Sequence, residues 1–175
     1  FLPCAGELDA NEPKFVDGKV ETIPELKEAI NAYQEAGLCT SAYDLEIGGM
    51  QLPWMVDQAL NGMFVCANNP AHMYLFLTQG VANMLDACGS RELKDKYLPN
   101  LVEGKWFGTM CLSEPQAGSS LADIRTKAEL NADGSYSISG TKMWISGGDQ
   151  DLTENIIHMV PVSYTHLRAH ETVAN

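Results

Sequence analysis

The sequence lacks several features that mark common classes of protein. Basic residues are scarce: 11 Lys and Arg stand against 23 Asp and Glu, for a formal net charge of −12 at pH 7. That charge is a poor match to nucleic-acid phosphates or anionic lipid, so we expect no nucleic acid and no membrane among the partners. No apolar run is long enough to span a bilayer. The opening FLPCAGELDANEP has no initiator Met, so we expect residues before Phe1, and a preceding leader stays open.

Motifs for disulfides, metals and phosphate-binding loops are also missing. The five cysteines are an odd number and none are spaced as CxxC, so we interpret them as reduced, mostly buried thiols. Reduced thiols without a visible leader predict a cytoplasmic protein. His166 and His170 have a spacing that could chelate a metal on a helix, but we predict no metal site. Neither GxGxxG nor a P-loop motif occurs, so the usual nucleotide-binding fingerprints are not supported.

The first two thirds of the chain show helical periodicity. IPELKEAINAYQEAG predicts a helix with Pro24 near its start, and LPWMVDQALNGMFVCAN predicts a helix over about 53–67. PAHMYLFLTQGVANMLDACG predicts a third helix, which is apolar nearly all round and should therefore be central. Ser90 is a candidate N-cap for a short helix through Tyr97, and Pro99 then starts one more turn.

The pattern changes at KWFGTMCLS, which predicts a strand, as do GTKMWISG and NIIHMV. Asp133-Gly134, between two strand-like runs, is typical of a hairpin turn. We therefore predict an α+β protein with an all-α helical domain over 1–105 and an antiparallel β-domain over 106–160. The ending PVSYTHLRAHETVAN resembles peptides made by translating sequencing-adapter DNA, so we interpret 161–175 as a non-native tail.

The stretch CLSEPQAGSSL places small hydroxyl groups around a turn. Pro115 and Gly118 break regular structure, so the chain must turn after the predicted strand. Gly118 and the serines beside it offer N–H and hydroxyl groups in a small space, which suits an anion such as phosphate. An ordinary polar turn is the alternative.

Trp144 and Ser146 lie two residues apart on a predicted strand and would share one face. An indole beside a hydroxyl could form a wall for a flat heteroaromatic ligand, and a packed surface tryptophan is the alternative. Ser113 ends the earlier strand, and hairpin pairing would bring it close to both. Together these residues favour a flat, phosphorylated cofactor, of which a flavin nucleotide is one candidate.

These stretches resemble the acyl-CoA dehydrogenase family. Glu46-Ile47-Gly48-Gly49, GSRELKDKYLPNLVEGKWFG, MCLSEPQAGSSL and GTKMWISGG follow that family's order and spacing, over roughly residues 9–160. The sequence from RTKAE to NIIH is similar to that of the subgroup that includes 3-methylmercaptopropionyl-CoA dehydrogenases. Ser120 departs from the family, which usually has Asp there, so the role of that position is not carried over.

The resemblance implies a helical domain, a middle β-barrel domain and a C-terminal four-helix bundle. The bundle would be missing here, and the barrel would be cut about halfway. FAD is the implied cofactor, acyl-CoA the implied substrate and electron-transfer flavoprotein the implied partner. The full-length protein would be a homo-oligomer.

The implied FAD-contacting residues form two segments. They are Met110, Cys111, Leu112, Ser113, Gly118 and Ser119 in the first, and Trp144, Ile145 and Ser146 in the second. By resemblance, Ser113 bonds the pyrimidine side of the isoalloxazine, and Ser119 lies between the FAD pyrophosphate and the acyl-CoA substrate. Trp144 packs by the flavin ring, and the hydroxyl of Ser146 bonds near flavin N5.

The implied reaction is the α,β-dehydrogenation of an acyl-CoA thioester, in which a carboxylate removes the α-proton and the β-hydrogen leaves as hydride. The family's base is a Glu of the bundle, so we expect no catalytic residue here and an inactive fragment. We interpret Glu114 as structural and His72 as a satisfied core residue. The alternatives are a non-catalytic FAD- or CoA-binding fragment and a relative that responds to DNA alkylation, which the acidic balance disfavours.

Overall fold

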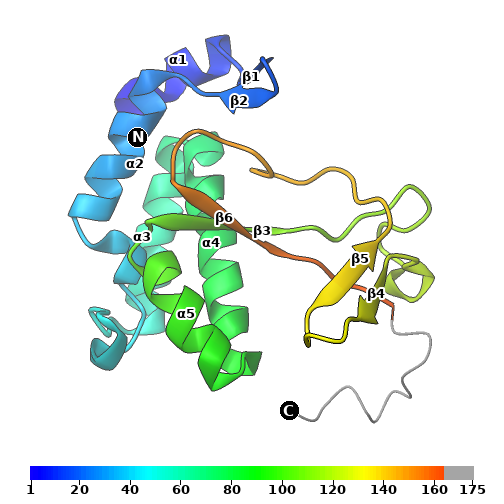
Figure 1. Ribbon diagram of the computed structural model, residues 1–175. Helices are drawn as coiled ribbons and strands as arrows, with labels where there is room; N and C mark the ends of the chain where they lie inside the picture. Colours follow the sequence, from blue (N-terminus) through cyan, green and yellow to red (C-terminus); the bar gives the residue numbers. More distant parts are fainter. Residues whose placement is uncertain (164–175) are drawn as a thin grey trace. The chain divides into compact units, whose positions relative to one another are not determined.

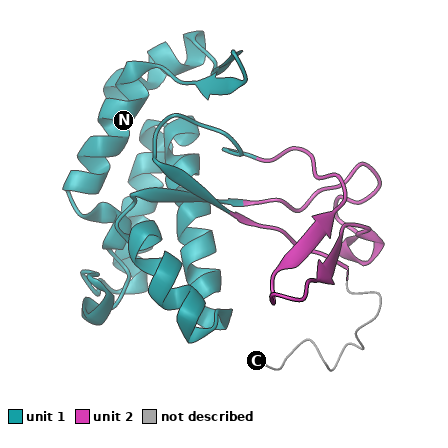
Figure 2. Ribbon diagram, in the orientation of Figure 1, with its two compact units in different colours: residues 1–109, 146–157 teal, residues 110–145, 158–175 magenta. Residues whose placement is uncertain are grey.

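The computed structural model describes residues 1–163, which form two compact units (Figure 2). Unit 1 comprises residues 1–109 and 146–157. Unit 2 comprises residues 110–145 together with the chain from residue 158 onward. His166, His170 and most of the predicted tail lie outside the described residues.

Within the described residues, the α-helices all belong to unit 1 (Figure 1 and Figure 2). They are α1 (Ala5–Ala10), α2 (Pro24–Glu35), α3 (Trp54–Ala67), α4 (Asn69–Cys88) and α5 (Arg91–Val102). Short 3-10 helices occur at Leu2–Cys4, Leu38–Thr40, Leu45–Ile47 and, in unit 2, Leu121–Asp123. The predictions for α2, α3 and α4 are confirmed, whereas α1 was not predicted because a single short turn carries little periodicity.

Helix α4 is central to unit 1, as its composition predicted. It packs against α2, α3 and α5. The core around it includes Leu26, Ile30, Leu75 and Phe107, each no more than 3% exposed. Burial of such a side chain stabilises the fold by roughly 1.5–3 kcal/mol.

Helix α5 confirms one prediction and corrects another. The Ser90 hydroxyl accepts a hydrogen bond from the Leu93 backbone N–H at 3.3 Å, which is the predicted N-cap. The predicted break before Pro99 is wrong, because α5 continues through it to Val102. The last turn buries Leu101 and Val102, at 2% and 1% exposure, and this packing outweighs the hydrogen bond that proline removes.

The strands pair in two-stranded sheets. Strands β1 (Lys14–Val16) and β2 (Lys19–Glu21) form an antiparallel hairpin that was not predicted. Strand β3 (Trp106–Met110) pairs with β6 (Asn155–Met159), and β4 (Lys127–Leu130) pairs antiparallel with β5 (Tyr136–Ser139). Strands β3, β4, β5 and β6 lie where strands were predicted.

The turn between β4 and β5 lies at the predicted Asp133-Gly134. Gly134 has a φ of +83°, a left-handed conformation that glycine adopts without steric cost. The Asp133 carboxylate accepts hydrogen bonds from the backbone N–H and the hydroxyl of Ser135, at 2.9 and 2.6 Å. The pairing of Ala128 with Ile138 then sets the register of the hairpin.

The strand predicted at GTKMWISG is absent from the described structure. Residues 140–147 join no ladder, and Trp144 has a φ of +61°, far from extended backbone. The alternation that would put Trp144 and Ser146 on one face therefore does not apply. The protein is nonetheless a mixture of helix and sheet, as predicted, and the division at residue 105 stays a prediction.

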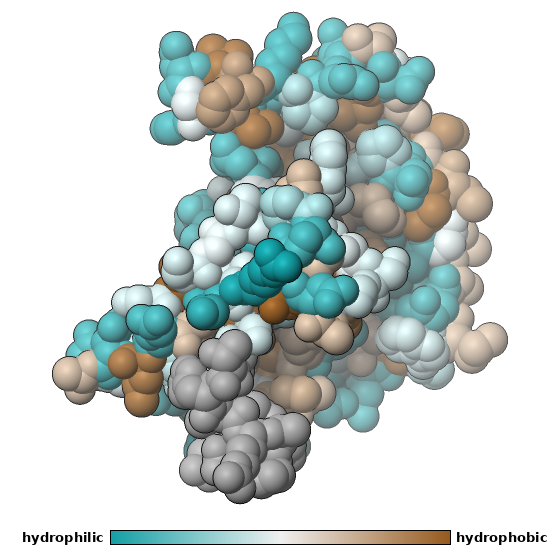
Figure 3. Space-filling view, turned by 90° about the vertical axis from the view of Figure 1, so that its right-hand side faces the viewer, coloured by the Kyte–Doolittle hydropathy of each residue, from teal (hydrophilic) through white to brown (hydrophobic). Residues whose placement is uncertain are grey.

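The described surface is mixed in character. Figure 3 shows hydrophobic residues scattered among hydrophilic ones over one face. Within residues 1–163, no helix combines the length and hydropathy needed to cross a membrane.

Candidate functional site

The chain after β3 closes the predicted tight turn. The Glu114 N–H donates to the Ala117 carbonyl at 2.8 Å, and the Ala117 N–H donates back to the Glu114 carbonyl at 3.0 Å. Pro115 and Gln116 lie exposed between them. Proline pre-sets the φ that a turn needs at this position.

The Glu114 carboxylate is buried and accepts hydrogen bonds at both oxygens. Oε1 accepts from the Thr126 backbone N–H at 3.0 Å and from Lys142 Nζ at 2.9 Å. Oε2 accepts from the Arg125 backbone N–H at 2.8 Å and from Gln116 Nε2 at 2.6 Å. A buried charge is tolerable only with such partners. Glu114 therefore ties the turn to two other segments of unit 2.

These contacts keep Glu114 ionised. Hydrogen bonding from Thr126, opposed by desolvation and reinforced by Arg125 and Lys142, holds the pKa of the Glu114 carboxyl well below its ordinary value of 4.5. A carboxylate with so low a pKa and all its partners internal is poorly suited to proton transfer near neutral pH. The geometry agrees with a structural role for Glu114.

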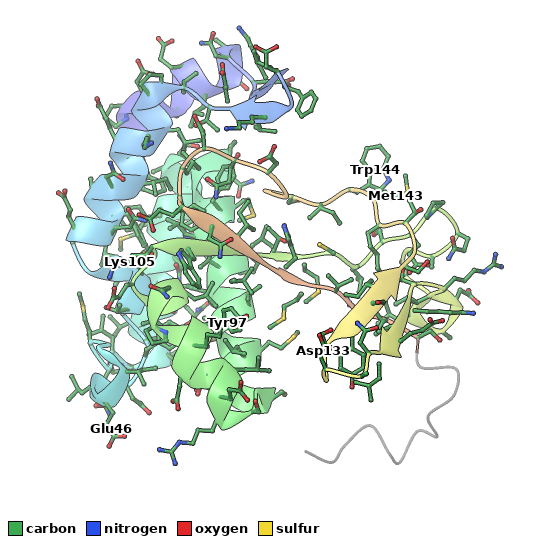
Figure 4. The ribbon with its side chains drawn as sticks, in the orientation of Figure 1. Glu46, Tyr97, Lys105, Asp133, Met143 and Trp144 are labelled. Carbon is green, nitrogen blue, oxygen red and sulfur yellow. The ribbon has the colours of Figure 1, made fainter. Side chains whose placement is uncertain are left out.

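A main-chain hydrogen bond brings the two predicted flavin-contacting segments together within unit 2. The Met143 N–H donates to the Ser113 carbonyl at 2.9 Å, and Lys142 Nζ donates to the Leu112 carbonyl at 3.2 Å. Trp144, the next residue, is 84% exposed. Figure 4 shows Met143 and Trp144 on this loop, with the indole pointing away from β4 and β5. The uncovered indole is free to stack on a flat ring.

The loop after the turn offers hydrogen-bond donors. Gly118, Ser119 and Ser120 are exposed, and a Cβ added at Gly118 would meet no atom within 4 Å. Among the described residues, the backbone N–H groups of Gly118 and Ser119 have no acceptor. Free N–H and hydroxyl groups suit phosphate oxygens. A flat ring that carries phosphates therefore fits the residues of this unit.

The remaining predicted contact residues of unit 2 are less accessible. Met110 ends β3 and is half-buried, as is Ile145. Cys111 is buried, and its N–H donates to the Met159 carbonyl at 2.8 Å. The side chains of these three residues are therefore less available to a ligand than those of the exposed residues beside them.

Ser146 belongs to unit 1 and lines an apolar hollow of about 310 Å³. The rest of the lining comes from α1 and the loop after it, from α2, from α4 and from the residue after Ser146. These residues are Leu8, Asp9, Glu12, Pro13, Leu26, Pro70, Met73, Tyr74, Leu77 and Gly147. The predominantly apolar wall can accept a hydrocarbon group.

Unit 1 also buries a polar network that the sequence analysis did not find. Asp57 accepts from the Ser41 hydroxyl at 2.5 Å and from Asn61 Nδ2 at 3.0 Å. Asn61 Oδ1 lies 3.0 Å from His72 Nε2. Burial lowers the pKa of His72, and nearby Asp57 only partly opposes this. His72 is a core residue as predicted, although its Nδ1 has no partner within residues 1–163.

Lys142 is the residue of this region that sequence reasoning missed. It lies in GTKMWISGG, where a lone lysine in a predicted strand suggests an exposed side chain. Its side chain is instead only 11% exposed. Its place two residues before Trp144, in the stretch GTKMWISGG that resembles the family, was the sequence feature that could have indicated it.

Comparisons with known proteins bear on the family. The family described as "Acyl-CoA dehydrogenase, N-terminal domain" matches residues 6–105. The 3-methylmercaptopropionyl-CoA dehydrogenase of Ruegeria pomeroyi is 38% identical over 160 residues, which are 91% of this chain and 27% of that protein. The broad-specificity linear acyl-CoA dehydrogenase FadE5 of Mycobacterium tuberculosis is 41% identical over 158 residues, which are 88% of this chain and 25% of that protein.

A solved structure is similar as well. The acyl-CoA dehydrogenase from Bacillus anthracis complexed with FAD matches with a TM-score of 0.73 and 25% identity, over 92% of this chain and 26% of that one. This chain thus spans about a quarter of the length of these proteins. Since the family match covers more than half of the 175 residues, the chain belongs to the acyl-CoA dehydrogenase family.

Proposed function

We propose that this chain is the N-terminal part of an FAD-dependent acyl-CoA dehydrogenase and forms one wall of its flavin site. The observation that carries the proposal is the Met143–Ser113 hydrogen bond, which brings the two segments together beside the uncovered indole of Trp144. Family membership supports the reaction class, since the similar proteins named above are acyl-CoA dehydrogenases.

The residues of this chain would bind and orient the cofactor. When bound, FAD would supply the flavin as hydride acceptor for the acyl β-carbon. Ser113 would donate to the ring, the N–H groups of Gly118 and Ser119 would hold phosphate oxygens, and Trp144 would cover the ring and exclude water. Such preset donors and ring contacts fix the reacting atoms in place.

The substrate would be an acyl-CoA that also contacts Ser119. Taken by itself, the hollow of unit 1, whose wall includes Ser146 together with Met73 and Leu77 of α4, would accept a hydrocarbon group. Burial of a hydrocarbon chain against such side chains is favourable by about 0.8 kcal/mol per methylene group.

The rest of the machinery would lie outside this chain. The catalytic glutamate would come from a C-terminal four-helix bundle, and further strands would complete the β-domain of residues 106–160 into a barrel. The complete protein would be a cytoplasmic homo-oligomer that passes electrons to an electron-transfer flavoprotein. The chain by itself would bind flavin without turning over substrate.

Titration of the 175-residue chain with FAD, followed by gel filtration, tests the flavin site. Because stacking on an aromatic ring contributes roughly 1–3 kcal/mol, we expect Trp144→Ala to weaken FAD binding about tenfold or more. Trp54→Ala is the matched control, since Trp54 is 60% exposed but lies in unit 1. Equal loss in both variants, or no retained flavin with the unaltered chain, would contradict the proposal.

Anaerobic addition of acyl-CoA to the flavin-loaded chain tests the location of the base. We expect the flavin absorbance to stay unchanged, because the proposed catalytic glutamate is not in this chain. Bleaching of the flavin would show that a carboxylate within residues 1–175 removes the α-proton.

A further inference from the structure

The ion pair of Glu114 and Lys142 is unusually well buried for this chain. Lys142 Nζ lies 2.9 Å from Glu114 Oε1, and the two side chains are 11% and 2% exposed. The pair of Lys94 and Asp86, by contrast, has side chains 34% and 53% exposed. Desolvation makes a buried pair weak evidence for stability, so a role in fixing geometry is the better explanation.

No strand ladder joins the two segments that this pair spans. Strand β3 ends at Met110, and residues 140–147 join no sheet. One main-chain bond, from Met143 to Ser113, holds them together, and a single bond specifies register weakly.

Lys142 supplies the missing constraint. Its Nζ donates to the Leu112 carbonyl at 3.2 Å and to the Glu114 carboxylate at 2.9 Å. These partners are the residues on either side of Ser113, so one ammonium group is hydrogen-bonded to the chain both before and after Ser113. The three donors from Gln116, Arg125 and Thr126 hold the Glu114 carboxylate in place for this contact.

We infer that Glu114 and Lys142 are positioning residues that set the spacing between Ser113 and Trp144 and thereby the affinity of this wall for flavin. The inference rests on the proposed function. Neither residue need touch the cofactor, because both act through the two segments that do.

Hydrogen exchange without FAD tests the hold on the loop. In the 175-residue chain, we expect Lys142→Met to speed exchange of the Met143 amide roughly tenfold or more, because its acceptor Ser113 is no longer held. Exchange in α4 should not change. Lys94→Met is the matched control and should leave the Met143 amide protected. Unchanged protection in Lys142→Met would overturn the inference.

FAD binding tests the consequence for the site. We expect Lys142→Met to raise the Kd for FAD roughly tenfold to hundredfold, with a changed visible spectrum of the bound flavin. Lys142→Arg keeps the charge and should restore most of the affinity, whereas Lys94→Met should match the unaltered chain. Lost protection at Met143 with an unchanged Kd would overturn the inference, since the pair would then stabilise the loop alone.

Two further results separate the possible failures. If the unaltered chain binds no FAD, the proposed function and the claim about flavin affinity both fail, while exchange still decides whether the pair holds the loop. If Lys142→Met does not fold, Gln116→Ala removes one donor from Glu114 through an exposed residue. Faster Met143 exchange with unaltered FAD affinity in that variant would also overturn the inference.

Discussion

The two units are held together by different kinds of interaction. Unit 1 buries apolar side chains such as Ile30 and Phe107, at 0% and 2% exposure, around α4. In unit 2, β5 is exposed throughout and β4 buries only Ala128. The buried centre of unit 2 is instead the polar contact set of Glu114, whose carboxylate accepts hydrogen bonds from two other segments, at Arg125 and Thr126 and at Lys142.

The difference shows how a surface can stay open for a ligand. A polar contact set fixes loops through directed hydrogen bonds and does not require a covering layer of apolar side chains. Trp144 can therefore remain 84% exposed on a loop whose backbone is still held. Unit 1 has its own buried polar network at Asp57, but there it is surrounded by packed helices.

The largest expected effect is on stability, and it follows from the difference in apolar packing between the two units. Ile30→Ala should lower the free energy of unfolding of unit 1 by about 2–5 kcal/mol, because it leaves a cavity in the core. Ile138→Ala, at a residue 56% exposed on β5, should change stability by less than about 0.5 kcal/mol. Urea unfolding followed by helical circular dichroism and by hydrogen exchange of β4 and β5 measures both. Similar losses in the two variants would contradict the comparison.

Mild acid should weaken unit 1 first. Burial lowers the pKa of His72 below 6.5, with Asp57 opposing, so the unfolded state binds more protons as the pH falls past 6.5. The contribution of His72 to the stability of unit 1 is thus fully present above pH 6.5 and declines as the pH falls from there to the lower folded pKa. His72→Gln should remove this part of the pH dependence of the urea midpoint. An identical pH profile in the variant would show that His72 is not responsible.

Stronger acid should be needed to weaken unit 2. The pKa of Glu114 lies well below 4.5 in the folded chain, chiefly through Thr126, so its contribution is present above pH 4.5 and declines as the pH falls below it. Hydrogen exchange of β4 and β5 on acidification reads this out. In Glu114→Gln, this contribution to the acid dependence of exchange should be missing. If the variant keeps the full acid dependence, the assignment to Glu114 is contradicted.

Local sequence signals determined the parts of this protein whose partners lie nearby in the chain. The apolar spacing of α2 and α4, the cap at Ser90 and the turn at Gly134 all act within a few residues, and each was predictable. The motif around Ser113 and Trp144 likewise indicated the family from the residues alone.

Only the tertiary structure decided which face each element turns inward. Helix α3 buries Asp57 and exposes Met55 and Met63, at 79% and 67%, because Asp57 finds partners in Ser41 and Asn61. Asn61 lies one turn further along α3, whereas Ser41 lies outside the helix, and helical periodicity does not reveal a partner on another segment.

The geometry of the candidate site was decided in the same way. Local residues favoured a strand at 140–147, but the backbone there follows its contacts with the turn instead of a ladder. Lys142 and Glu114 are 28 residues apart, so the local sequence around each residue does not predict their ion pair. The sequence by itself determined helices α2, α3 and α4, the turn at Gly134 and the family. The spacing of Ser113 and Trp144 was decided only on folding, because hydrogen bonds between distant segments set it.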